Sequence, residues 1–199
     1  MFGLSYLDIS AGMGLCATAV LTLNFLLGMM LSTAYKRSAY WKKMPEAVKG
    51  ISIDRVHNWT AYVALLLVVL HPVFLLLDKT SGFQLQDVFF PNGAPTQATF
   101  VWLGTISFYA LLLVIVTTQK AIKRRMSFRL WKNIHLVSYV TALLFISHGI
   151  LMDPLLKDRP TDWFDAEKML SEVCLVVLVA ASIARYRYHL KTKMPPAEG

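Results

Sequence analysis

The stretch DRVHNWTAYVALLLVVLHP, residues 54–72, places His57 and His71 at the two ends of an apolar run. A second stretch, WKNIHLVSYVTALLFISHG at residues 131–149, places His135 and His148 in nearly the same arrangement. Each run approaches the roughly 20 residues that a helix needs to cross about 30 Å of hydrocarbon. An ionisable side chain inside a membrane span costs free energy unless it is paired, so the repeated pattern indicates a functional site.

The composition places the whole chain among membrane proteins. Of its 199 residues, 56% are hydrophobic and only 16% are charged. Five apolar runs approach the length of a span, near residues 9–34, 57–77, 100–118, 134–152 and 169–186. These runs show no alternation with a period of two, which favours helices over a barrel. We therefore predict an all-α integral membrane bundle of five transmembrane helices, with residues 1–199 forming one domain.

The basic residues predict the orientation of these helices. The segments after the first, third and fifth runs hold 16 of the 20 Lys and Arg residues, whereas nine of the 12 acids lie on the other side. We expect the N-terminus outside and the C-terminus in the cytoplasm, in a bacterial cytoplasmic membrane. Asp8 rather than a base precedes the first run, so we interpret that run as a retained span. The net charge of +8 then reflects the orientation of the helices in the membrane. The expected partner is the lipid bilayer and not nucleic acid.

In this topology the second and fourth spans run in the same direction, so the four histidines fall into two levels. His57 and His135 lie near the cytoplasmic surface, and His71 and His148 near the outer one. The separations of 14 and 13 residues correspond to roughly 21 and 19.5 Å of helix rise. Imidazoles from two facing helices can supply both axial positions of a haem iron. The levels therefore predict two haems stacked across the membrane.

The angular positions of the histidines fit this hypothesis only in part. Fourteen residues place His57 and His71 within about 40° of one helix face, but 13 residues leave His135 and His148 about 140° apart on an ideal helix. The fourth span must be rewound or kinked, or its two haems must lie on different flanks. Two alternatives stay open: a His-based metal-ion transporter, and an anchor protein whose histidines bond between helices.

The paired spacing of these four histidines resembles the ferric reductase-like transmembrane domain, which NADPH oxidases, ferric reductases and bacterial relatives share. The resemblance extends from the first span to the fifth. It implies that His57 with His135 ligates an inner b-type haem, and that His71 with His148 ligates an outer one. It also implies electron transfer across the membrane, from a cytoplasmic-side donor to ferric iron, oxygen or a partner protein outside.

The sequence departs from the larger members of that family in its electron supply. It ends about 15 residues after the last predicted span, and it has no Gly-rich phosphate-binding turn. We therefore expect FAD and NAD(P)H to act only through a separate flavoprotein reductase, or else a quinol to be the donor. An alternative is a quinol-linked haem subunit that feeds a separate outer reductase. Leu75 stands where animal oxidases carry a further His, which argues against superoxide production.

Two bases beside the inner histidines are candidates for binding haem propionates. Arg55 precedes His57 by two residues, and Lys132 precedes His135 by three. A buried carboxylate needs a cation or hydrogen-bond donors. The positive-inside bias alone would also place bases here. Asn24, in the first span, is expected to bond to a neighbouring helix.

Overall fold

The computed structural model describes residues 4–153, 156 and 166–193. Its five long helices are α1 (Tyr6–Leu31), α4 (Ile53–Leu77), α6 (Ala98–Thr118), α8 (Phe128–Leu151) and α9 (Ala166–Lys193). Each is long and apolar enough to cross a membrane. The described part of the chain contains no strand. The prediction of an all-α integral membrane protein with five spanning helices is confirmed.

Most of these helices begin before the apolar run from which each of them is predicted. Ser5, Ser52 and Ser127 precede α1, α4 and α8, and each side chain accepts a hydrogen bond from a backbone N–H of the first turn. Such caps satisfy N–H groups that have no partner inside the helix, so the first turn can be polar. The helices therefore extend beyond the apolar residues.

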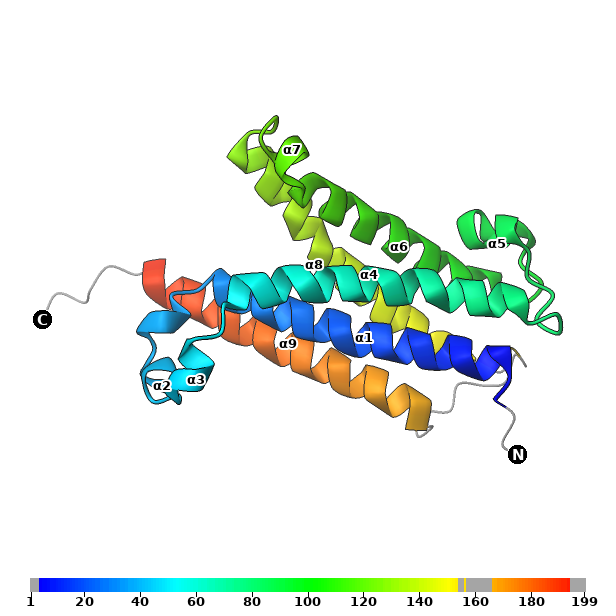
Figure 1. The fold of residues 1–199 in the computed structure, drawn as a ribbon, viewed down its shortest axis with the longest axis horizontal. Coiled ribbons are helices and arrows are strands. Elements are labelled where there is room, and N and C mark those ends of the chain that lie inside the picture. Colours follow the sequence, from blue (N-terminus) through cyan, green and yellow to red (C-terminus); the bar gives the residue numbers. More distant parts are fainter. Residues whose placement is uncertain (1–3, 154–155, 157–165, 194–199) are drawn as a thin grey trace, which may run out of the picture.

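Short elements fill the connections and distinguish the two ends of the bundle. The basic end carries η1 (Tyr35–Arg37), α2 (Ala39–Lys42), α3 (Glu46–Lys49) and α7 (Lys120–Lys123). The N-terminal end carries the start of α1 together with α5 (Leu85–Phe89) and η2 (Pro91–Gly93). In Figure 1 the chain enters α1 at the N-terminal end and α4 at the basic end, so these two helices are antiparallel.

The helices pack as two pairs joined by the last helix. α1 lies along α4, α6 lies along α8, and α9 packs against α1 and α8 (Figure 1). The core between them includes Leu21, Ala64, Phe145, Ile146 and Leu178. Many other apolar side chains of the same helices are exposed, as expected for surfaces that face lipid. α4 and α8, which carry the histidines, therefore come from different pairs.

Hydrogen bonds fasten the N-terminal end of the bundle. The Asp78 carboxylate, directly after α4, accepts bonds from Thr80 Oγ1 (2.6 Å), from Thr80 N (2.9 Å) and from Leu7 N of α1 (3.1 Å). These bonds, with that from the Thr80 side chain first, lower the pKa of Asp78. The α5 segment is held against α6, because Thr105 Oγ1 donates to Val88 O (3.1 Å) and Tyr109 OH donates to Phe89 O (3.1 Å).

Candidate functional site

Helices α4 and α8 bring the four histidines together as two facing pairs. The ring centres of His57 and His135 are 6.4 Å apart, and the ring planes make an angle of 75°. The ring centres of His71 and His148 are 6.2 Å apart, at an angle of 80°. These are the pairs that the sequence spacing predicts, one toward each end of the bundle.

The ring spacing fits a metal ion held between two imidazoles. A metal–nitrogen bond of about 2.0 Å on each side, with about 1.1 Å from each nitrogen to its ring centre, separates two ring centres by about 6 Å. Both pairs have this spacing. The donor set also fits the axial sites of a haem iron, which commonly takes imidazole nitrogens.

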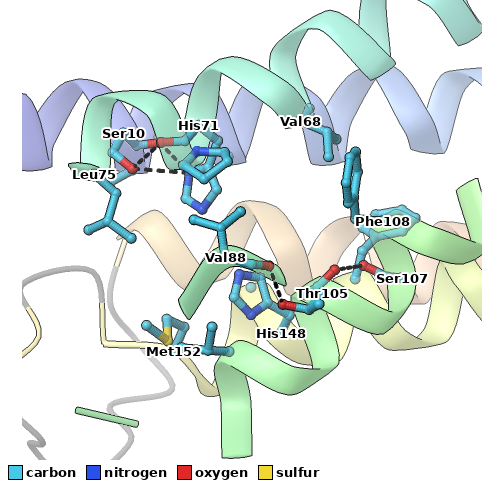
Figure 2. A pocket seen from close by; sticks show the side chains of 18 of the residues that line it. Ser10, Val68, His71, Leu75, Val88, Thr105, Ser107, Phe108, His148 and Met152 are labelled. Carbon is cyan, nitrogen blue, oxygen red and sulfur yellow. Dashed lines mark hydrogen bonds between the residues drawn. The ribbon is translucent and has the colours of Figure 1, made fainter. Parts of the chain in front are cut away.

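The His71 ring is held by a hydrogen bond and a close contact with α1. Its Nδ1 lies 2.8 Å from Ser10 O, and Ser10 Oγ donates to His71 O at 2.8 Å (Figure 2). A carbonyl only accepts, so Nδ1 carries the proton and Nε2 keeps a free lone pair. The ring also packs against Gly14, where a Cβ atom would come within 3.2 Å of Nδ1. The tautomer is therefore the one that a metal needs.

The rings of His57 and His148 are held in the same way. His57 Nδ1 lies 3.0 Å from Asn24 O, and a Cβ on Gly28 would be 3.1 Å from the ring. His148 Nδ1 lies 2.8 Å from Phe100 O. A Cβ on Gly104 would approach three atoms of that ring at 3.0 to 3.2 Å. Each of these three rings thus rests on a glycine of a neighbouring helix.

The three contacts form a recurring unit, which we call the glycine seat. In each, the accepting carbonyl lies four residues before the glycine: Ser10 before Gly14, Asn24 before Gly28, and Phe100 before Gly104. In a helix that carbonyl already accepts from the N–H of the glycine itself. Because the glycine has no side chain, an imidazole can reach the second lone pair of the carbonyl.

The fourth ring, His135, has a different environment. Its Nδ1 is buried and has no hydrogen-bond partner within the described residues. The ring stacks on Trp131, with centres 5.3 Å apart and planes 20° apart, and Lys123 Nζ lies 3.9 Å from the centre of the Trp131 ring. An aromatic stack therefore fixes this ring in place of a glycine seat.

The sequence of α6 provides no glycine at the level of His135. His135 lies thirteen residues from His148 in α8, and Thr117 lies thirteen residues from Gly104 in α6. Thr117 therefore lies near the axial level of His135, but thirteen residues turn it about 140° around α6 from the face of Gly104. It has a side chain, and its Oγ1 donates to Leu113 O at 2.7 Å, the carbonyl four residues earlier.

The structure answers the angular objection raised by the 13-residue spacing. α8 is one continuous α-helix from Phe128 to Leu151, so it is not rewound between His135 and His148. It runs at an angle to α4 (Figure 1), and the two imidazole pairs nevertheless face each other, with ring centres 6.4 and 6.2 Å apart. The offset therefore does not prevent the two pairs from forming.

A cavity of about 310 Å³ adjoins the His71–His148 pair (Figure 2). Its walls are mainly apolar side chains, among them Val68, Leu75, Val88, Phe108 and Phe145. Small, mostly apolar cavities with a few polar groups are typical of ligand and cofactor sites. The polar side chains that line it are Ser10, Thr18, Asp87, Thr105, Ser107, Asp153, Lys168 and Ser171.

The two predicted propionate partners lie at the basic end. Arg55 is exposed and lines a second hollow, of about 390 Å³, together with Asp54 and Trp59; His57 is not among its lining residues. Lys132 is exposed on the first turns of α8. Their role toward a cofactor stays a prediction. The Asn24 side chain donates to Thr60 Oγ1 at 2.8 Å and to His57 O, so it bonds to a neighbouring helix, as expected.

Sequence reasoning missed the glycines, although a signal for two of them was present. Gly14 and Gly28 are fourteen residues apart, as are His57 and His71. Because α1 and α4 are antiparallel, equal spacings place each glycine opposite one histidine. Lys168, one of the four bases outside the three basic segments, lies buried at the cavity.

Comparison with known proteins places this arrangement in a family. The family model described as ferric reductase like transmembrane component matches residues 13–146. The match includes His57, His71 and His135, and it ends two residues before His148. A search of curated proteins found no match. Because the matched region covers more than half of the chain, this protein belongs to the ferric reductase-like transmembrane component family.

Proposed function

We propose that this protein is a membrane b-type cytochrome in which His57 with His135 and His71 with His148 hold two haems. The observation that carries the proposal is the twice-repeated imidazole pair, with ring centres 6.4 and 6.2 Å apart. Membership of the ferric reductase-like family supports electron transfer across the membrane. Bound haem would supply one-electron redox chemistry.

The chain's own residues prepare each pair for this task. The carbonyls of Ser10, Asn24 and Phe100 hold the Nδ1 proton of three histidines, so that Nε2 is available as a ligand. A mainly apolar cavity wall adjoins the His71–His148 pair. Burial and hydrogen bonding are two of the means by which a protein tunes the potential of an iron centre.

In the proposed orientation the N-terminal end of the bundle faces outward and the basic end faces the cytoplasm of a bacterial cell. Electrons would pass from the inner pair, His57–His135, to the outer pair, His71–His148. The donor is a separate flavoprotein reductase, which brings FAD and NAD(P)H, or a quinol. The acceptor is ferric iron, oxygen or a partner protein. The membrane potential changes the driving force by about 2.3 kcal/mol per charge per 100 mV.

The proposal is tested on detergent-purified protein that has been expressed with ample haem. We expect a pyridine haemochrome assay to give about two b-type haems per chain, and a reduced-minus-oxidised spectrum typical of iron with two imidazole ligands. A folded protein that binds no haem under these conditions would contradict the proposal. It would favour the metal-ion transporter instead, which predicts metal uptake without a redox spectrum.

The proposal predicts that the two haems differ, because among the described residues only the His135 ring has no hydrogen-bond partner at Nδ1. Such a bond makes an imidazole more basic, and a more basic ligand stabilises oxidised iron. We therefore expect a spectroscopic redox titration to give different midpoint potentials for the His71→Ala variant, which keeps the inner pair, and the His57→Ala variant, which keeps the outer pair. Equal potentials in the two variants would contradict this explanation.

A further inference from the structure

Two polar side chains of α9 are buried against the cavity beside the His71–His148 pair. Lys168 is 5% exposed and Ser171 is 0% exposed. They are three positions apart in the sequence (i, i+3), so they share one face of the helix. Both line the cavity together with His71 and His148. A Cβ atom on Gly149, the residue after His148, would come within 3.0 Å of Ser171 Oγ, which places this hydroxyl at the level of His148.

Among the described residues, neither side chain has a partner that accounts for its burial. Ser171 Oγ is buried and makes no hydrogen bond within the described part of the chain. The one ion pair found among the described residues joins Lys49 to Glu46, so no described carboxylate oxygen lies within 4.0 Å of the Lys168 ammonium. A buried ammonium is costly unless an anion or several acceptors balance it.

The other hydroxyls of the cavity wall are already committed as donors. Ser10 donates to His71 O, Thr18 to Gly14 O, Thr105 to Val88 O and Ser107 to Gly104 O. Asp87 and Asp153 also line the cavity. An ionised carboxylate only accepts hydrogen bonds, so these two side chains cannot bind an anion. Lys168 and Ser171 are therefore the donors that the described wall leaves available.

We infer that Lys168 and Ser171 form a carboxylate-binding site next to His148. The inference rests on the proposed function, and it assigns to this site a propionate of the haem held by His71 and His148. The ammonium supplies the charge and up to three donors, and the hydroxyl supplies one more. A carboxylate on the electron acceptor, such as a ferric carboxylate chelate, is the other source of the same chemistry.

The test compares haem with its dimethyl ester, in which both propionates lack charge. Apoprotein from haem-deficient cells is titrated with each compound, and binding is followed by Soret absorbance. The titration uses a His57→Ala background, which keeps the His71–His148 pair. Into this background we introduce Lys168→Met, Lys168→Arg or Ser171→Ala. Lys79→Met, at an exposed lysine of the same end of the bundle, is the matched control.

We expect Lys168→Met to weaken haem binding about tenfold or more, as for the loss of a hydrogen bond to a charged group. Lys168→Arg should restore most of the affinity, Ser171→Ala should have a smaller effect, and Lys79→Met none. Binding of the dimethyl ester should be equally weak with and without Lys168. Removal of the cation should also lower the midpoint potential of this haem, because a nearby positive charge stabilises the reduced state.

The outcomes separate this inference from the proposed function. If Lys168→Met weakens binding of haem and ester alike, or of neither, the propionate assignment is wrong although the protein is still a cytochrome. If haem binding is unchanged but the variant raises the KM for ferric citrate, the carboxylate belongs to the acceptor. If neither the wild type nor the His57→Ala background binds haem, both the proposed function and the inference fail.

Discussion

Replacing His148 with alanine is expected to remove one of the two haems and to leave the other in place. His148 faces His71 at 6.2 Å, and nothing else in the described cavity wall offers a second imidazole at that level. Loss of a residue that only supports a metal ligand already costs 10- to 100-fold in metal affinity. Loss of the ligand itself should weaken binding by more than about 100-fold. The haemochrome assay should then give about one haem per chain.

Comparison among the single histidine variants tests which two histidines bind the same haem. His71→Ala should leave the same residual spectrum and midpoint potential as His148→Ala, because both retain the His57–His135 pair. His57→Ala and His135→Ala should share a different residual spectrum. His189→Ala is the control, since His189 is exposed near the end of α9, and it should keep both haems. The pairing would be wrong if His71→Ala and His148→Ala left different haems behind.

Gly104→Ala should produce the second large effect, by adding a single methyl group. The new Cβ would approach three atoms of the His148 ring at 3.0 to 3.2 Å, closer than ordinary contact. The ring cannot move away without losing the bond from Nδ1 to Phe100 O. Such overpacking typically costs about 1–3 kcal/mol. We therefore expect weaker haem binding at the His71–His148 pair, a shifted Soret band and a lower melting temperature.

Gly12→Ala is the matched control for this substitution. Gly12 is also inside a spanning helix, but a Cβ there meets no heavy atom within 4 Å. Alanine in the interior of a helix is more stable than glycine by about 0.5–1 kcal/mol. The two alanine variants should therefore change the melting temperature in opposite directions. Equal effects, or an unchanged haem spectrum in Gly104→Ala, would show that the glycine seat does not position His148.

The sequence predicted the spanning helices well because lipid imposes a simple requirement on them. A span must be apolar over most of its length and must satisfy its backbone internally, and both conditions are visible in composition. The helix starts were missed because a capping serine, such as Ser52 or Ser127, lets a polar first turn precede the apolar run. The N-outside orientation and the single-domain assignment stay predictions.

The pairing of the histidines was predictable from spacing, but its details depended on tertiary packing. The 140° offset in α8 looked unfavourable on an ideal helix, yet the packed structure brings both pairs within 6.4 and 6.2 Å. Lys168 has the charge of a surface residue, and its burial becomes visible only when α9 packs beside the cavity.

The glycine seats have a consequence for how fast the proposed cytochrome can work. The rate of electron transfer falls when atoms around the redox centre must shift each time its charge changes. Rings that are wedged against a helix backbone and tied to a carbonyl have little room to shift, and this applies to His57, His71 and His148. The seats would therefore keep the reorganisation energy small at both levels of the membrane. In such a protein, rigid ligands would favour fast electron transfer.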